Sequence, residues 1–238
     1  MHHLGCLILC LALLLAGLLP AAFPGVMESA FEKLGTPRDL AFYIFLGILI
    51  GSALNVPVAR IPSQGYLCRD PLAVLGLGGL LPRLQERQKY RLVAINVGGG
   101  LIPLAVAAYE VVHLIRLVSS AAAVSPESAS LQGTLIAAFL TVMINIFVCW
   151  KIARPIPGIG LAVPGLVPGL LAAASALFFA GEFAPPVAYI AGVLGPLIGA
   201  DILHLGDLRA RPVGLASIGG AGTFDGIVLS AVLAVFLG

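Results

Sequence analysis

The sequence predicts an all-α integral membrane protein of about seven transmembrane helices, several of them broken by glycine or proline. Of its 238 residues, 60% are hydrophobic and only 10% are charged, whereas a soluble domain has about 25% charged residues. The mean hydropathy is +1.08. The 29 glycines and 17 prolines favour close helix packing and kinks. We therefore expect residues 1–238 to form a single transmembrane domain.

Seven apolar segments reach or approach the length of about 20 residues that crosses a bilayer core about 30 Å thick. The expected helices cover residues 4–23, 40–59, 92–115, 134–153, 164–181, 186–204 and 222–237. Asn145, in the middle of the fourth segment, is expected to form an interhelical hydrogen bond. The first segment has the length of a signal-peptide core, but only "MHH" precedes it, without Lys or Arg. We expect it to be retained, and six helices would remain if it were cleaved.

The basic residues predict the orientation of these helices. Ten of the thirteen fall in the loops after the second, fourth and sixth segments, and the other three are Lys33, Arg38 and Arg116. Because Lys and Arg stay on the cytoplasmic side, we expect an inner (plasma) membrane protein with its N-terminus in the cytoplasm and its C-terminus outside. The cytoplasmic loop 60–91 has an apolar first half and a basic second half, which predicts either a re-entrant or surface-lying segment or a partly ordered loop.

The three cytoplasmic connections share a pattern of arginine, proline and glycine. "VARIP", "IARPIPGIG" and "RARPVGLASIGG" each place an arginine before a proline that stops the helix. The helices that follow open with glycine or proline. This pattern is either ordinary punctuation of helix ends or irregular backbone that dips into the bilayer beside a wet cavity.

Ionisable groups within apolar segments are the main functional candidates, because each costs about 2.5 to 3.5 kcal/mol at the bilayer centre. Glu110 with His113, and Asp201 with His204, have the i, i+3 spacing found in metal sites of helical bundles. Glu110 would lie about 27 Å along its helix, in the opposite leaflet from Asp201. We therefore expect no shared metal, and an interfacial Glu110 and His113 pair at the outer surface near Arg116.

Asp201 and Asp225 are expected in the same leaflet, because the sixth helix descends to the cytoplasm and the seventh rises from it. An antiparallel hairpin could bring the two acids face to face. Two carboxylates at close range in a low dielectric do not both ionise readily, so the pair would share a proton. This arrangement suits a proton or cation relay and equally an aspartic hydrolase. In the alternative interpretation, Asp225 only caps its helix and Asp201 meets interfacial water or a nearby arginine. The supporting candidates are His204, Gly222, Thr223, Arg154 and Arg211.

Three stretches carry a family resemblance: "ARPIPGIGLAVPG" at 153–165, "AYIAGVLGPLIGADILHL" at 188–205 and "ASIGGAGTFDGIVLSAVLA" at 216–234. They resemble the prokaryotic membrane-protein family called domain of unknown function 1614. The resemblance implies a polytopic membrane protein of uncharacterised activity, and it supplies no catalytic residues.

The placement of the two acids is also similar to that in presenilin-type intramembrane aspartic proteases. That similarity would make Asp201 and Asp225 the catalytic pair. The sequence departs from the Gly-x-Gly-Asp motif of those enzymes, since Phe224 stands directly before Asp225. Ala200 replaces the tyrosine before the other acid, and no Pro-Ala-Leu motif follows.

Three classes of function remain open at this point. They are a small transport or channel-like module whose acid pair binds protons or cations, an intramembrane aspartic-type hydrolase, and a non-catalytic membrane scaffold. The expected partners are the lipid bilayer and another membrane protein or a second copy. The net charge of +2 is too small for a nucleic-acid surface. No cofactor or metal is expected, because Cys6, Cys10, Cys68 and Cys149 have no metal-binding spacing.

Overall fold

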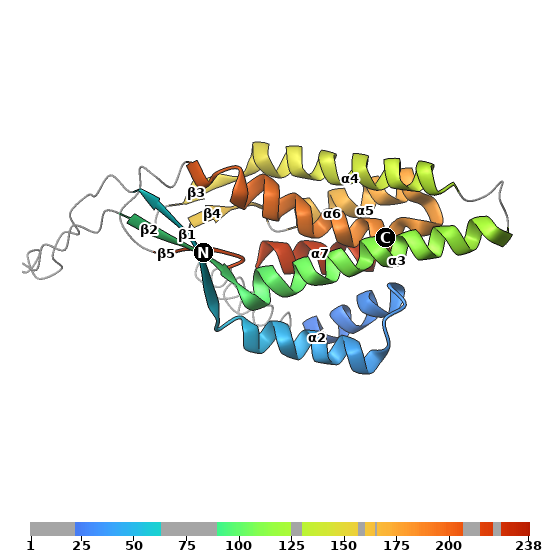
Figure 1. The fold of residues 1–238 in the computed structure, drawn as a ribbon, viewed down its shortest axis with the longest axis horizontal. Helices are drawn as coiled ribbons and strands as arrows, with labels where there is room; N and C mark the ends of the chain where they lie inside the picture. Colours follow the sequence, from blue (N-terminus) through green and yellow to red (C-terminus); the bar gives the residue numbers. More distant parts are fainter. Residues whose placement is uncertain are drawn as a thin grey trace, which may run out of the picture.

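The computed structural model describes residues 22–62, 90–124, 130–156, 160–164, 166–206, 215–220 and 225–238. The helices run along the long axis of the molecule, and the labelled strands lie together at one end (Figure 1). After a first helix at residues 22–33, the α-helices are α2 (Arg38–Gly51), α3 (Ile102–Val124), α4 (Leu131–Ile152), α5 (Val167–Ala180), α6 (Ala184–Leu194) and α7 (Gly226–Leu237). The described chain is therefore mostly helical, as the composition predicts.

Two small sheets correct the all-α expectation. The strands β1 (Asn55–Pro62), β2 (Tyr90–Asn96) and β5 (Leu215–Ile218) form one sheet in the order β1-β2-β5. In this sheet β1 is antiparallel to β2, and β5 is parallel to β2. The strands β3 (Arg154–Ile156) and β4 (Gly160–Ala162) form an antiparallel pair. The connections that the sequence places on one side of the membrane thus meet at one end of the molecule.

The expected helix at 40–59 is wrong beyond Gly51, where α2 ends and the chain soon enters β1. Pro57 has no backbone N–H to continue a helix, and the β-branched Val56 and Val58 favour an extended chain. The segment is apolar, as predicted, but beyond Gly51 it is not helical. Only the end of the expected first helix, and only the ends of the loop 60–91, fall within the described residues.

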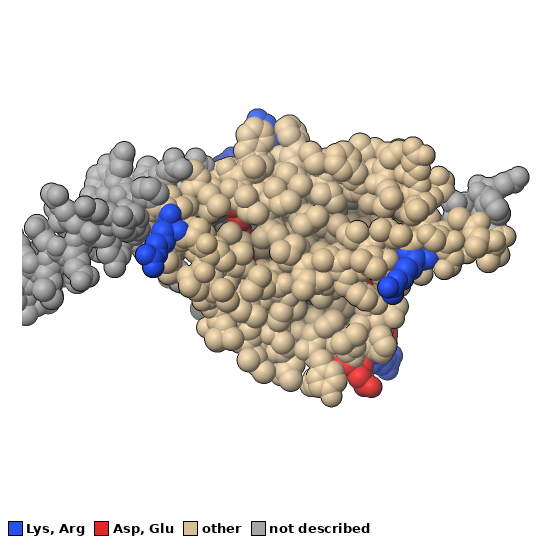
Figure 2. All heavy atoms as spheres, in the orientation of Figure 1, with Lys and Arg blue, Asp and Glu red and all other residues tan. Residues whose placement is uncertain are grey.

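Within the described residues, three helical stretches are long and apolar enough to cross a membrane, namely Val97–Val124, Leu131–Ile152 and Val167–Ile202. Large apolar side chains on α4, among them Phe139, Met143 and Phe147, face outward, as suits a lipid environment. Figure 2 shows only a few Lys, Arg, Asp and Glu side chains on this face, most of which is uncharged. These features fit a membrane protein, although the described residues do not contain seven full-length spans.

The third stretch is a helical hairpin. Gly181 has a φ of +55° and begins the short 3₁₀ turn η2 (Gly181–Phe183), after which α6 packs back against α5. Buried Asn145 on α4 fastens this hairpin, because its Nδ2 donates hydrogen bonds to the carbonyl oxygens of Pro168 at 3.2 Å and Ala191 at 2.8 Å. The predicted interhelical role of Asn145 is therefore confirmed.

Helix 22–33 and α2 lie together along one flank of the bundle (Figure 1). Met27, Phe31 and Leu34 are buried in the same apolar cluster as Tyr189 of α6. The Nζ of Lys33 donates a 2.8 Å hydrogen bond to the carbonyl oxygen of Phe236. This helix therefore covers α6 and holds the C-terminal end of α7.

Candidate functional site

Asp201 and Asp225 lie on two different elements that contact each other. Asp201 lies in η3 (Gly195–Ile202), the π-helical continuation of α6, and Asp225 is the N-cap of α7. The two carboxylates are near enough to interact electrostatically, and the backbone amide of Gly219 lies within hydrogen-bonding reach of Asp201. The Oδ1 of Asp225 accepts a 3.0 Å hydrogen bond from the backbone N–H of Ile227. Both residues are partly buried.

The position of Asp201 depends on glycine and proline in η3. Pro196 has no N–H to give to an α-helical hydrogen bond, and the chain continues in wider π turns, which are rare and often occur at functional sites. Gly199 lies so close to α4 that a Cβ there would be 2.3 Å from the carbonyl oxygen of Ile146. Contact with the backbone of α4 therefore holds the turn that carries Asp201.

The corner after β5 brings Gly219 to the site. Gly219 has a φ of +68°, and a Cβ there would lie 2.5 Å from the carbonyl carbon of Gly99 in the π-helical turn η1 (Val97–Leu101). A side chain is excluded by both the backbone conformation and the space. Glycine at this position thus lets the backbone N–H approach Asp201.

A polar network at the sheet fixes this corner. The Oγ of Ser217 on β5 donates a hydrogen bond to the Oδ1 of Asn55 on β1. Asn96 is fully buried, accepts from the backbone N–H of Gly99 at 2.8 Å and donates to the carbonyl oxygen of Ser52 at 2.8 Å. Sequence reasoning did not assign these residues to the site. The only indication of them in the sequence was that asparagines occur beside apolar segments and glycine-rich corners.

Of the supporting candidates, His204 and Arg154 fall within the described residues. The Nδ1 of His204 lies 3.1 Å and 3.0 Å from the carbonyl oxygens of Gly199 and Ala200, so the ring closes the end of η3. Arg154 lies exposed on β3. Gly222, Thr223 and Arg211 are outside the described residues.

The Glu110 side chain is completely buried by other parts of the protein, which the sequence did not indicate. Its Oε2 lies 3.2 Å from the Nδ1 of His113, and its Oε1 has no hydrogen-bond partner within the described part of the chain. The segment expected as an outer loop instead forms helix 22–33 and a turn. At that turn, a Cβ on Gly35 would lie 3.7 Å from the Cε1 of His113. The extra layer of chain moves Glu110 from the surface to the interior.

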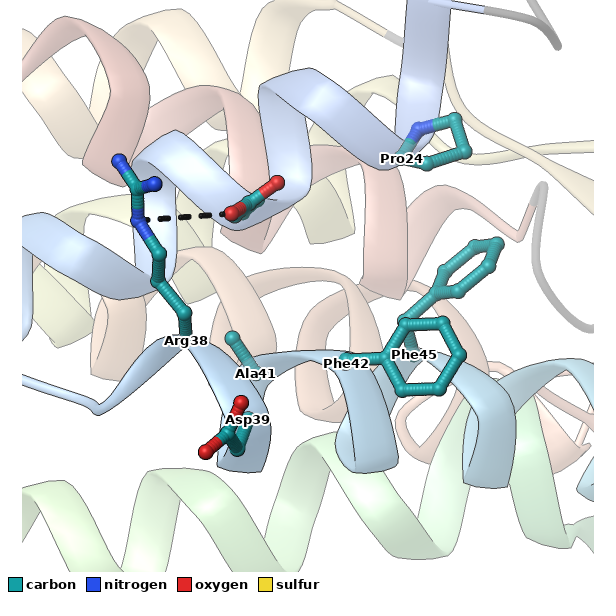
Figure 3. A pocket seen from close by; sticks show the side chains of 7 residues that line it. Pro24, Arg38, Asp39, Ala41, Phe42 and Phe45 are labelled. Carbon is teal, nitrogen blue, oxygen red and sulfur yellow. Dashed lines mark ion pairs between the residues drawn. The ribbon is translucent and has the colours of Figure 1, made fainter.

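A separate cleft of about 220 Å³ lies between helix 22–33 and α2 (Figure 3). Arg38 at its edge is 3.6 Å from Glu28 and hydrogen-bonded to Glu32. The hydrogen bond to Glu32, with the charges of both acids, raises the pKa of Arg38 above its ordinary value. Since two carboxylates already engage this arginine, the cleft is a weaker candidate than the acid pair. The lining residues are Pro24, Glu28, Arg38, Asp39, Ala41, Phe42 and Phe45.

Comparison with known proteins agrees with the sequence resemblance. The family model described as "Protein of unknown function (DUF1614)" matches residues 49–237, a region that includes both acids and every labelled helix from α3 to α7. No curated protein and no solved structure matches the chain. Because the match covers well over half of the sequence, the chain belongs to the DUF1614 family of proteins of unknown function.

Proposed function

We propose that this chain is a small polytopic transport or channel-like protein that binds a proton, or another small cation, at Asp201 and Asp225. The proposal rests on the contact between η3, which carries Asp201, and α7, which Asp225 caps, and on the repulsion between the two carboxylates. Either acid alone could be an ordinary helix-end residue. Two carboxylates repel each other, and few other charges lie in this protein. Such a pair is therefore stabilised when it binds a positive charge.

The length of α7 supports an intramembrane position for the pair. Its 12 residues extend about 18 Å at 1.5 Å per residue, whereas the bilayer core is about 30 Å thick. Its C-terminal end is bonded to Lys33, whose ammonium group belongs at a water interface. Asp225, at the other end, would then lie about 10 Å inside the opposite interface. A lone carboxylate at the centre of the core costs about 2.5 to 3.5 kcal/mol, and a shared proton would offset part of such a cost.

The local backbone suggests different roles for the two acids. Asp225 faces the N-terminus of α7 and accepts a backbone hydrogen bond there, which stabilises a negative charge. Asp201, in η3, has no helix N-terminus of its own to stabilise a charge. We therefore assign Asp225 as the ionised partner and Asp201 as the acid that gains and loses the proton.

The surrounding irregular backbone also fits a transport site. Strand β5 and the π-helical turns η1 and η3 lie next to the pair. Such backbone is stable at membrane depth only where protein covers it or where it lines a water-filled cavity, and transporters place ion sites at broken helices. With the basic loops in the cytoplasm, the proposal places the sheet end of the molecule inside and the C-terminus outside an inner (plasma) membrane.

The test is proton flux into liposomes that contain the purified full chain and a trapped pH dye, driven by an imposed membrane potential. The wild type is expected to acidify the vesicles faster than protein-free liposomes. Asp201→Asn and Asp225→Asn are each expected to reduce the flux to the protein-free rate. Asn caps a helix about as well as Asp, so Asp225→Asn keeps α7 intact.

The matched control is Asp39→Asn, which makes the same change at an exposed position on α2. It is expected to keep the wild-type flux. A wild-type rate equal to that of protein-free liposomes, or full flux in both site variants, would overturn the proposal.

A hydrolase remains the second candidate because extended backbone lies directly beside the acids. β5 ends at Ile218, and the next residue, Gly219, reaches Asp201. In such a reaction the ionised acid takes a proton from water as its oxygen bonds to the carbonyl carbon of the substrate. The protonated acid donates to the carbonyl oxygen, and the C–N bond then breaks as nitrogen gains a proton. Cleavage of a transmembrane reporter peptide that is lost in Asp201→Asn, without proton flux in the wild type, would favour this activity.

A further inference from the structure

A second ionisable pair lies in the membrane-spanning body, away from the acid pair. Glu110 and His113 occupy one face of α3, where the carboxyl Oε2 and the imidazole Nδ1 are 3.2 Å apart. The Glu110 side chain is 1% exposed and that of His113 is 24% exposed. One member of the pair is therefore enclosed, and the other reaches the surface.

The surroundings leave Glu110 without enough polar partners for a full negative charge. Its Oε1 is buried and makes no hydrogen bond to any described group. Phe31 of helix 22–33 packs against the ring of Tyr189, and Tyr189 is the titratable group of α6 that faces Glu110. An ionised carboxylate here would keep one oxygen unpaired in an apolar layer, which is strongly unfavourable.

The other charged groups nearby are engaged elsewhere or exposed. On helix 22–33, Lys33 is bonded to the carbonyl oxygen of Phe236, and Glu28 and Glu32 lie beside Arg38. Arg116, one turn beyond His113 on α3, is exposed. The Tyr109 ring stacks on the imidazole with ring centroids 5.8 Å apart. Among the described residues, His113 is thus the titratable side chain that forms a hydrogen bond with Glu110.

We infer that Glu110 and His113 form a second proton-binding site, in which His113 exchanges a proton with the surface and Glu110 receives it inside the bundle. With one proton the pair has no net charge, and without it the pair carries a buried negative charge. When the proton moves inward, the Nδ1–H bond of His113 breaks and an O–H bond forms on Glu110. The ring is left neutral and the carboxylate becomes a carboxylic acid.

This site does not depend on the function proposed for Asp201 and Asp225. It is built by α3, α6 and helix 22–33, whereas the acid pair is built by η3, α7 and the corner after β5. Proton binding at Glu110 would persist in a protein that carries no proton flux. The two proposals can therefore fail separately.

The experiment is infrared difference spectroscopy of the full chain in liposomes across a pH titration, together with a count of protons taken up. The wild type is expected to show a carboxylic acid C=O band that Glu110→Gln removes, and to bind one proton more per chain than this variant. Glu182→Gln, the same change at an exposed position, is the matched control and is expected to keep both signals. Asp201→Asn is also expected to keep the Glu110 band.

His113→Gln gives a second measurement that retains Glu110, and it keeps the test valid if Glu110→Gln does not fold. The Glu110 band is expected to remain, with a shifted pH midpoint, because the partner that exchanges the proton is gone. The inference is overturned if Glu110→Gln leaves the band and the proton count unchanged. It is also overturned if His113→Gln leaves the midpoint where it was.

Discussion

Gly199→Ala is the substitution whose effect follows most directly from the packing of the site. Gly199 lies two residues before Asp201 and against α4. A Cβ there would be 2.3 Å from the carbonyl oxygen of Ile146, 2.8 Å from the Cβ of Cys149 and 3.0 Å from the backbone nitrogen of Trp150. The first distance is about 1 Å shorter than an ordinary contact. Two of these atoms are backbone atoms of α4, so no side-chain rotation can relieve the clash.

The expected cost is at the upper end of the range for overpacking. Inserting a methyl group into a filled core costs about 1 to 3 kcal/mol, and replacing a helical glycine by alanine returns about 0.5 to 1 kcal/mol. The net loss should be about 2 kcal/mol, which for a chain of this size lowers the midpoint of thermal unfolding by about 4 to 8 °C. Because η3 and α4 must separate, we also expect the proton flux assigned to Asp201 to fall.

The assay is thermal unfolding followed by the fluorescence of Trp150, the single tryptophan of the chain, which lies at this contact. Gly25→Ala is the matched control, because a Cβ at Gly25, in helix 22–33, meets no atom within 4 Å. It should keep or slightly raise the midpoint. If Gly199→Ala unfolds at the same temperature as Gly25→Ala, the close packing of η3 on α4 is not what holds Asp201 in place.

Two further substitutions test the polar contacts. Asn145→Ala should destabilise the protein by about 2 kcal/mol, since it loses two hydrogen bonds worth about 1 kcal/mol each. Asn145→Asp should lower the stability further, because both hydrogen-bond partners are carbonyl oxygens and a carboxylate has no proton to donate to them. Equal unfolding midpoints for Asn145→Ala and Asn145→Asp would contradict this expectation. Asp225→Ala should cost about 1 kcal/mol through loss of the α7 cap, whereas Asp225→Asn should stay within a few tenths. The free energy of unfolding of each variant would be measured by chemical denaturation in detergent. An equal loss of stability in Asp225→Ala and Asp225→Asn would show that the charge, rather than the cap, stabilises α7.

The sequence could predict that Asp201 and Asp225 lie toward the same end of the molecule, because this depends only on chain direction. One acid ends a segment that runs toward the loops, and the other begins the segment that runs back. That their carboxylates face each other stays a prediction. Asn145 was predictable for a similar reason, since a buried amide in the middle of an apolar helix must find a hydrogen-bond partner on a neighbouring helix.

The errors have a common cause, which is contact between segments far apart in the sequence. Hydropathy alone cannot separate an apolar helix from an apolar strand, so β1 was predicted as the end of a helix although Pro57 argued against it. The burial of Glu110 comes from helix 22–33, which packs over α3 and α6, so the sequence of α3 alone could not indicate it.

The parallel pairing of β5 with β2 sets an order of assembly. Leu92 pairs with Leu215 and Ile95 with Ile218, so more than a hundred residues separate the partners, and such non-local pairing forms late in folding. The strand β2 is therefore synthesised long before its partner β5, and the corner that carries Gly219 takes its place only when β5 completes the sheet. A variant that prevents β5 from pairing would leave a bundle with its long helices inserted and its two carboxylates apart.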